Sequence, residues 1–406
     1  MQAEQQRGME SLRELYRTGR GPSSSHTMGP ERACRAFAQK NPTADHFRTV
    51  LYGSLAKTGK VHGTDRVIVR TLETMPCTVE WNTERTDLPH PNTMELFAYR
   101  GDQEIDRMTV LSVGGGKICT PGAAVAEAAR VYPLDTFGDI AAYCRTHGLR
   151  LWQYVEQTEG EDISQYIAQA WASMQSCIAR GLQDEGILPG GLQVVKKAKT
   201  LMEKATWSES AQTRENRMVC SFAFAVGEQN AGGETIVTAP TCGAAGVMPA
   251  VLYYVKQTQG YRDEDICHAL ETGGLIGNLI KTNASISGAE CGCQAEIGSA
   301  CAMAAAALAE LYGMGLDEIE YAAEIAIEHH LGLTCDPICG LVQIPCIERN
   351  AVAAMRAINA VNLAGFLSDT RKISLDEVIH TMAETGRDIN GRYRETSEGG
   401  LANLRL

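Results

Sequence analysis

Five cysteines in the last third of the chain are the residues best suited to chemistry. Cys291 and Cys293 lie in GAECGCQAEIG, Cys335 and Cys339 lie in GLTCDPICG, and Cys346 lies in VQIPCIERN. Cys335 follows Cys293 by 42 residues and precedes Cys346 by 11, which is neither the tight pairing of a zinc finger nor the compact run of a ferredoxin. Thiolates from three helix ends could instead hold an iron–sulfur cluster with one open iron, a Lewis acid for a hydroxyl or carboxylate. The spacing does not choose three of the five, and the alternative is that all are small buried side chains.

A run of hydroxyl side chains near the N-terminus is the second candidate. The sequence GPSSSHT supplies Ser23, Ser24, Ser25, His26 and Thr27, just before a helix that we expect to begin near Pro30. Hydroxyls and free backbone N–H groups at a helix entrance suit a carboxylate, which the helix dipole also attracts. The structural alternative is a helix N-cap, but a cap needs one such side chain and not three. We therefore interpret this run as a site for a substrate carboxylate.

Two further histidines are candidates for proton transfer. His62 lies between small residues in LYGSLAKTGKVHGTD, and His90 lies between two prolines in LPHPN. Histidine is the commonest general base near neutral pH. A single histidine is also often structural, and the sequence alone leaves that alternative open for both residues.

The elements that must position these residues differ between the two parts of the chain. The first 115 or so residues have a mixed α/β pattern, which ends at Gly114-Gly115-Gly116 and predicts a domain boundary near 116–132. The helices expected there span 9–16 and 30–39, and the strands span 46–52, 77–81, 94–99 and 108–113.

From Asp135 onward the pattern is helical. The predicted helices span 136–146, 161–182, 190–205, 213–229, 261–280, 299–313, 317–330, 346–362 and 374–386. Glycine-rich loops at 231–246, 283–292 and 332–340 separate some of them. Loops held by a rigid scaffold commonly carry function, and the cysteines lie in or beside the last two.

Composition excludes several classes of protein. The chain has 406 residues, of which 44% are hydrophobic, and a net charge of −12, so we expect no nucleic-acid partner, which would need a basic face. The longest apolar stretch, Ala300 to Ala309, is far short of the ~20 residues that span a bilayer, so we expect no membrane partner. The polar N-terminus has no apolar secretory region. We expect a cytoplasmic protein whose fourteen cysteines are free thiols.

Five segments, taken in order, resemble one family over nearly the whole chain. They are GPSSSHTMGP, LYGSLAKTGKVHGTD, TAPTCGAAGVMPAVL, NASISGAECGCQAEIG and GLTCDPICGLVQIPCIERN. The family is that of the iron–sulfur-dependent L-serine dehydratases, or L-serine ammonia-lyases, in the form with β and α regions fused in one polypeptide. The resemblance implies that Cys293, Cys335 and Cys346 hold the cluster.

The resemblance also implies a reaction and a fold. A four-iron four-sulfur cluster, without pyridoxal phosphate, would convert L-serine into pyruvate and ammonia. His62 is the preferred base, with His90 and His26 as further catalytic residues, while Ser23, Ser24, Ser25, Thr27 and Asn283 bind substrate. The fold would be α+β, with an N-terminal α/β domain (1–132) carrying a small mixed sheet, packed on a larger all-helical catalytic domain (133–406). We expect the active site in the cleft between them, and a homodimer.

Several positions depart from the family pattern. Cys291 and Cys339 stand where relatives carry small apolar residues, and Cys242 replaces a common asparagine, which leaves the preference for serine open. The last cysteine is Cys346, so no terminal cysteine can cap the open iron, and its fourth ligand should be water or substrate. The alternatives are the same chemistry on L-threonine or L-cysteine, a cluster- or zinc-bearing amino-acid sensor, and a protein without metal.

Overall fold

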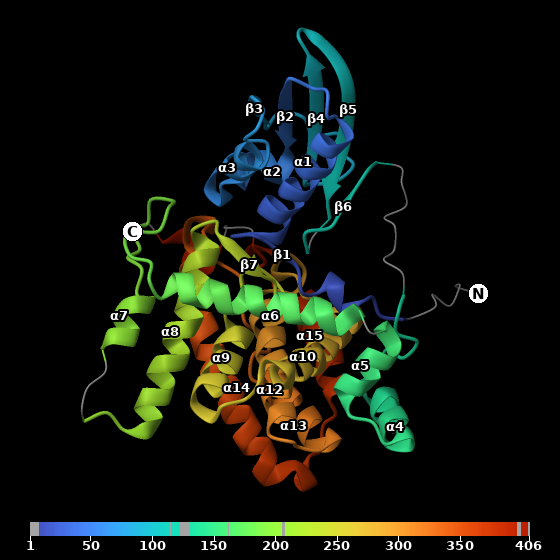
Figure 1. The fold of residues 1–406 in the computed structure, drawn as a ribbon, viewed down its shortest axis with the longest axis vertical. Helices are drawn as coiled ribbons and strands as arrows, with labels where there is room; N and C mark the ends of the chain where they lie inside the picture. The colour runs from blue at the N-terminus through green and yellow to red at the C-terminus, as the bar shows by residue number, and fades with distance from the viewer. Residues whose placement is uncertain are drawn as a thin grey trace. The chain divides into compact units, whose positions relative to one another are not determined.

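A computed structural model describes residues 8–113, 115–121, 130–160, 162–204, 208–395 and 399–404. The chain forms two compact units (Figure 1). The sheet unit comprises residues 19–127 and 230–235, and the helical unit comprises residues 1–18, 128–229 and 236–406. Two of the passages of the chain between the units fall within β1 (Thr18–Arg20) and β7 (Thr235–Val237), which pair as a two-stranded sheet. The predicted boundary region, 116–132, lies partly outside the described residues.

The sheet unit is built on five strands in the order β3-β2-β4-β5-β6. Their bounds are β2 (His46–Tyr52), β3 (Cys77–Asn82), β4 (Thr93–Arg100), β5 (Gln103–Ser112) and β6 (Ile118–Cys119). β2 and β3 run parallel, while the other neighbours are antiparallel. A parallel pair needs a crossover connection, and α2 (Gly53–His62) and α3 (Thr64–Thr71) provide it. The four predicted strands and the mixed sheet are confirmed; α2 and α3 are additional.

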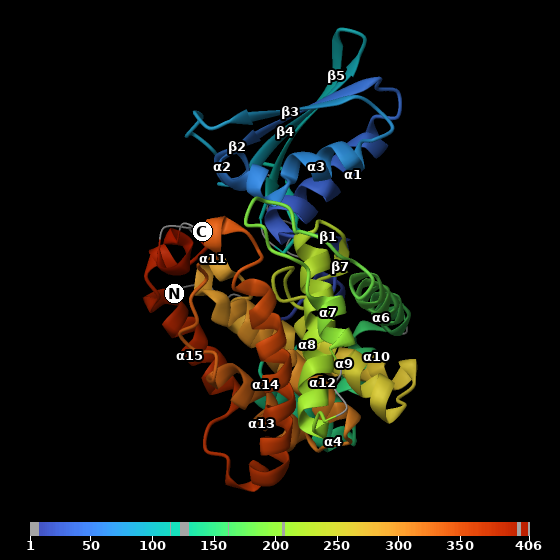
Figure 2. The same cartoon turned by 90° about the vertical axis from the view of Figure 1, so that its left-hand side faces the viewer.

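Alternation along β2 gives the sheet its two faces. Phe47 and Leu51 point into a core that they share with Phe37 of α1 (Gly29–Lys40). Val50 and Tyr52 point to the opposite face, as a strand period of two requires. Figure 2 shows α1, α2 and α3 on one face of the sheet. Because α2 begins directly after β2, the core fixes the helix whose last residue is His62.

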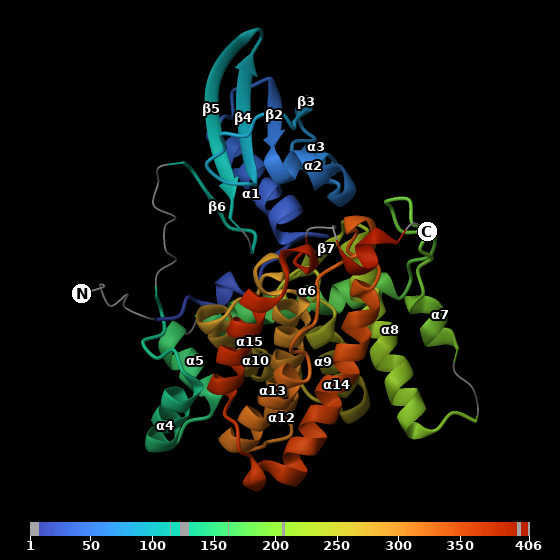
Figure 3. The same cartoon turned by 180° about the vertical axis from the view of Figure 1, so that it is seen from behind.

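The helical unit contains most of the chain. Its helices are α4 (Phe137–His147), α5 (Leu151–Glu159), α6 (Asp162–Gly181), α7 (Ala198–Glu203), α8 (Ala211–Ala231), α9 (Val247–Gln259), α10 (Asp263–Asn283), α11 (Gly288–Cys291), α12 (Ser299–Leu311), α13 (Leu316–Glu328), α14 (Cys346–Leu367) and α15 (Leu375–Asp388). Nearly every residue of α12 is buried, which is typical of a helix that is apolar all round. It packs on α9, α10, α13 and α14 (Figure 3).

The α+β fold class is confirmed, but some predicted elements are wrong. The helix expected at 9–16 is only the short 3-10 helix η1 (Leu12–Glu14). The helix expected at 190–205 is only α7, because Gly190 and Gly191 have φ values of 110° and 93°, outside the helical region. Helices α5 and α9 were not predicted. Among the described residues, no helix combines the length and the apolar character needed to cross a membrane.

Candidate functional site

Three of the five candidate cysteines come together in the helical unit. Cys293 precedes the π-helical turn η3 (Gln294–Gly298), Cys335 lies in the loop after α13, and Cys346 begins α14. The thiols of Cys293 and Cys335 and the Glu296 carboxylate lie within 4.8 Å of one another. Cys346 is close enough for the charge of Cys293 to raise the pKa of its thiol, after the larger effect of burial. π-helical turns are frequent at functional sites.

This set of donors fits an iron–sulfur cluster. Soft thiolates favour such clusters, or zinc, over hard cations. A hydrogen bond with Cys293, followed by burial, raises the pKa of the Cys335 thiol well above its ordinary value. Thiols in this position become thiolates beside a cation, because a coordinating metal deprotonates them. The site is therefore built to hold a positively charged group against several thiolates.

The remaining two cysteines have other environments. The buried Cys291 packs against α15, where a Cβ added to Gly386 would lie 2.5 Å from its sulfur. Cys339 is exposed within the 3-10 helix η4 (Ile338–Gly340), at a φ of 55°. Cys242, which stands in the 231–246 loop where the family commonly has an asparagine, is buried.

Two charged residues of this site were missed by the sequence analysis. Glu296 lies three residues after Cys293, and its Oε1 accepts a hydrogen bond of 2.8 Å from the Thr241 hydroxyl. Burial raises the pKa of the Glu296 carboxyl. Arg349 lies three residues after Cys346, one turn along α14, and donates to the carbonyl of Thr334 over 2.7 Å. Each of the two lies three residues after a candidate cysteine ligand, and this spacing is the feature of the sequence that could have indicated them.

The C-terminal segment holds the backbone of Cys335 in place. The Cys335 N–H donates to the carbonyl of Tyr393 over 2.8 Å, and the N–H of Glu395 donates to the carbonyl of Cys335 over 2.7 Å. The N–H of Leu401, in the 3-10 helix η7 (Gly400–Asn403), donates to the buried Asp336 carboxylate over 2.8 Å. The loop that carries Cys335 is thus fixed from both sides of the residue.

A second group of polar residues lies within the sheet unit, around His26 and His62. The two rings stack with centroids 4.5 Å apart. The Thr58 hydroxyl donates to the carbonyl of Ser54, so it accepts from Nε2 of His26 at 2.9 Å. Nδ1 of His26 then accepts from the Ser25 hydroxyl at 3.0 Å. Burial, and after it His62, lowers the pKa of His26 to about 3. With both nitrogens hydrogen-bonded and its pKa low, His26 is neutral at pH 7.

His62 is arranged differently, because no described residue makes a hydrogen bond with its Nε2. Its Nδ1 lies 3.0 Å from the carbonyl of Thr58, an acceptor, so Nδ1 carries the proton and Nε2 carries the lone pair. Burial lowers the pKa of His62, which keeps the ring neutral at pH 7. A neutral histidine with an available Nε2 is able to take up a proton.

His90 has the opposite tautomer. The backbone N–H of Asn92 donates to its Nδ1 over 3.0 Å, so the proton lies on Nε2. Burial lowers the pKa of His90 too. Its loop contacts the start of α2, where the Ser54 N–H donates to the carbonyl of Pro91 over 2.8 Å. His90 can therefore donate a hydrogen bond where His62 can accept a proton.

The hydroxyl run forms the π-helical turn η2 (Ser24–Met28) at the entrance to α1. Ser23 is its N-cap and accepts from the N–H of His26 over 3.2 Å. The buried Thr27 hydroxyl donates to the carbonyl of Arg20 over 2.9 Å. Ser24 and Ser25 are the partly exposed members. The structure thus gives Ser23 and Thr27 a role in shaping the turn and leaves the other two nearer to solvent.

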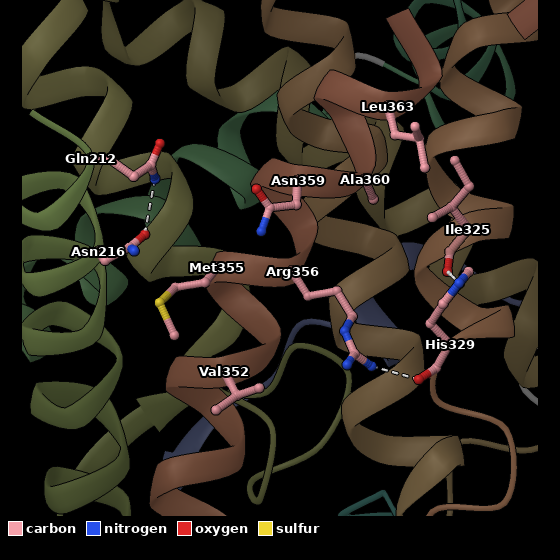
Figure 4. Close-up of a pocket in the computed structure, with 10 residues that line it drawn as sticks. All are labelled: Gln212, Asn216, Ile325, His329, Val352, Met355, Arg356, Asn359, Ala360 and Leu363. Atoms are coloured by element: carbon pink, nitrogen blue, oxygen red, sulfur yellow. Dashed lines mark hydrogen bonds between the residues drawn. The ribbon is translucent and has the colours of Figure 1, made fainter. Parts of the chain in front are cut away.

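Asn283 and one surface pocket lie elsewhere in the helical unit. The Asn283 amide, at the end of α10, donates to the carbonyls of Asp135 and Leu279. A pocket of about 580 Å3 lies among α8, α13 and α14, where Arg356 donates to the carbonyl of His329 (Figure 4). Its lining residues include none of the predicted site residues.

Comparison with known proteins gives consistent matches. Residues 11–83 match the family model described as serine dehydratase beta chain, and residues 82–402 match serine dehydratase alpha chain. L-serine dehydratase 1 of Escherichia coli is 40% identical, with 97% of this chain and 99% of the relative covered. The L-serine dehydratase of Streptomyces coelicolor is 40% identical over 97% and 98%, and that of Helicobacter pylori is 35% identical over the same shares.

Proposed function

The chain belongs to the serine dehydratase family, and from this premise we propose that it is a lyase that converts L-serine into pyruvate and ammonia. The observation that carries the proposal is the convergence of Cys293, Cys335 and Cys346, the same three thiols that the resemblance implies as cluster ligands. The reaction removes a proton from Cα and hydroxide from Cβ, which leaves an enamine. Its imine tautomer is hydrolysed by water to pyruvate and ammonia.

We propose that these three cysteines hold a four-iron four-sulfur cluster. When bound, the cluster supplies a Lewis acid for the leaving hydroxyl of the substrate. Arg349 supports the cysteines, because its guanidinium lies near the thiolates of Cys293 and Cys346 and offsets their negative charge. The segment that ends in Glu395 fixes the backbone of Cys335. The proposed reaction does not use pyridoxal phosphate.

The proton chemistry is assigned to the sheet unit. In this proposal Nε2 of His62 removes the Cα proton, since its other nitrogen is bound to a carbonyl. His90 donates a hydrogen bond from Nε2 to charge that develops on the substrate, and His26 positions the ring of His62 by stacking on it. The Ser24 hydroxyl donates to the substrate carboxylate, and the Ser25 hydroxyl does so once it turns away from Nδ1 of His26, in a turn shaped by Ser23 and Thr27. We retain Asn283 as a candidate for substrate binding.

L-Threonine and L-cysteine are the alternative substrates. Cys242 directly follows Thr241, whose hydroxyl contacts Glu296, so the residue that departs from the family pattern adjoins the thiol site. Competition of both amino acids against L-serine measures the ranking. We also retain two expectations, a homodimer and a cytoplasmic location.

The experiment that tests the function is anaerobic purification followed by assays of iron, sulfide and pyruvate. We expect about four irons and four sulfides per chain and pyruvate from L-serine. Cys293→Ala, Cys335→Ala and Cys346→Ala should each lose cluster and activity. Cys291→Ala and Cys339→Ala are the matched controls and should keep both. A complete cluster in Cys335→Ala, or a complete cluster without pyruvate formation in the unaltered protein, would contradict the proposal.

A further inference from the structure

We propose that the Glu296 carboxylate is the protein's own exchangeable oxygen donor for the iron that receives no cysteine. The inference rests on the proposed function, because it presumes a cluster held by Cys293, Cys335 and Cys346. In the absence of substrate Glu296 would bind this iron, and the oxygens of L-serine would displace it.

The first support is the place of the carboxylate among the thiols. Glu296 Oε2 lies 3.8 Å from Sγ of Cys335, and one oxygen of Glu296 lies within 4.8 Å of both Cys293 and Cys335. Glu296 and Cys293 belong to one continuous turn, so a group bound by Cys293 lies within reach of Glu296. Among the described residues, this is the one set of three candidate ligand atoms with that spacing.

The second support is the asymmetry between the two carboxylate oxygens. The Thr241 hydroxyl donates to Oε1 over 2.8 Å, which orients the carboxylate. Oε2 instead faces Cys335 and Gly288. A Cβ on Gly288 would lie 2.8 Å from Oε2 and 3.0 Å from the Cys335 sulfur, so only glycine leaves this approach open. A metal-ligating carboxylate is commonly oriented in this way by a hydrogen bond to its other oxygen.

The third support is the chemistry of exchange. A Lewis-acid site needs a position that substrate can occupy. Carboxylate is a harder and weaker ligand for such an iron than thiolate, so the hydroxyl and carboxylate of L-serine can replace it. The exchange moves no electrons, since one oxygen donor leaves as another binds. Glu296 would therefore protect the open iron between turnovers without blocking the reaction.

The test compares Glu296→Gln with Glu290→Gln, a carboxylate in the same loop region. Both proteins are purified anaerobically, exposed briefly to a limited amount of oxygen, and examined by electron paramagnetic resonance for the three-iron cluster that remains after one iron is lost. Loss of an outer hydrogen-bond partner of a ligand already weakens metal binding by about 10–100-fold. Loss of a ligand itself should cost at least as much, so we expect Glu296→Gln to lose this iron at least about tenfold faster. Glu290→Gln should match the unaltered protein.

A second measurement needs no variant, so it decides the matter if Glu296→Gln fails to assemble. The unaltered protein is labelled with carbon-13 in its glutamate carboxylates, reduced, and examined by electron–nuclear double resonance. We expect a carboxylate coupling to the cluster that disappears when L-serine is added. Absence of this coupling before L-serine is added, or equal iron loss in the two variants, would overturn the role of Glu296. Absence of cluster or pyruvate in the unaltered protein would instead overturn the proposed function.

Discussion

Glu271 in α10 gives a stability prediction whose size follows from the structure. Its side chain is fully buried, and the hydroxyl of Ser164, the nearby donor, is directed to Glu156 over 2.7 Å. Neither carboxylate oxygen of Glu271 makes a hydrogen bond of good geometry with the described residues. Burial, and after it the charges of Glu156 and Glu159, raises the pKa of Glu271 from 4.5 to about 8. The folded protein therefore holds a neutral carboxyl group here at pH 7.

The sign of the effect follows from proton binding in the two states. Below pH 4.5 the carboxyl is protonated in both the folded and the unfolded chain, so it has no effect on stability. Between pH 4.5 and about 8 the unfolded chain releases the proton and the folded chain retains it. Stability then falls by about 1.4 kcal/mol per pH unit, up to a total of about 5 kcal/mol. Glu271→Gln cannot ionise, so it should be more stable than the unaltered protein by up to about 3 kcal/mol at pH 7.

The assay is anaerobic urea denaturation at pH 5, 6, 7 and 8, followed by tryptophan fluorescence. Trp152 is a suitable probe, because it stacks on His268 of α10 with ring centroids 3.7 Å apart. The stability difference between Glu271→Gln and the unaltered protein should grow steadily with pH. Glu264→Gln, an exposed carboxylate of the same helix, is the control and should show no such growth. A difference for Glu271→Gln that does not change with pH would mean that Glu271 ionises at the same pH in the folded and the unfolded chain.

Three further predictions concern the reaction. His62→Ala should keep its iron and lose at least about 100-fold in kcat, the scale of a general base; near-normal turnover would mean that another group takes the proton. Because burial lowers the pKa of His62, the acid limb of kcat/KM should lie below the ordinary histidine value of 6.5. Air should inactivate the enzyme, saturating L-serine should slow that loss by mass action, and ferrous iron with thiol should restore activity. Indifference to air, or recovery without iron, would mean that no exposed iron takes part.

Much of the sheet unit could be predicted because its strands carry a strict alternation. The seven residues of β2 were predicted with the observed bounds, since Phe47 and Leu51 alternate with side chains of the other face. The helix α2 was missed because GSLAKTGKVH has two glycines and a weak apolar periodicity. It forms because the crossover from β2 to β3 requires a connection that packs on the sheet.

The candidate site could be predicted from the sequence only in part. The cysteines and the glycine-rich segments around them indicated a thiol site. The selection of three ligands from the five cysteines came from the family resemblance. In the structure burial against Gly386 and exposure in η4 separate Cys291 and Cys339 from the others, and both depend on contacts between distant segments. Glu296 was missed because a glutamate in a helical stretch is ordinarily a solvated residue.

The roles of the histidines also required three-dimensional contacts. His26, His62 and His90 are equivalent as residue types, and the sequence offered no means to rank them beyond the resemblance. The tautomer of His26 follows from the Thr58 hydroxyl that faces Nε2, and those of His62 and His90 follow from the carbonyl and the N–H group that face Nδ1. These partners distinguish an acceptor from a donor, which a linear motif does not.

Mössbauer spectroscopy of protein enriched in the Mössbauer-active iron isotope, with and without L-serine, tests most directly whether the substrate binds an iron of the cluster. If an iron of the cluster acts as the Lewis acid for the leaving hydroxyl, L-serine should change the spectrum of one iron in each cluster and leave the other three unchanged. If L-serine leaves all the irons unchanged while pyruvate is formed, substrate does not bind the cluster, and the cluster is not the Lewis acid for the leaving hydroxyl.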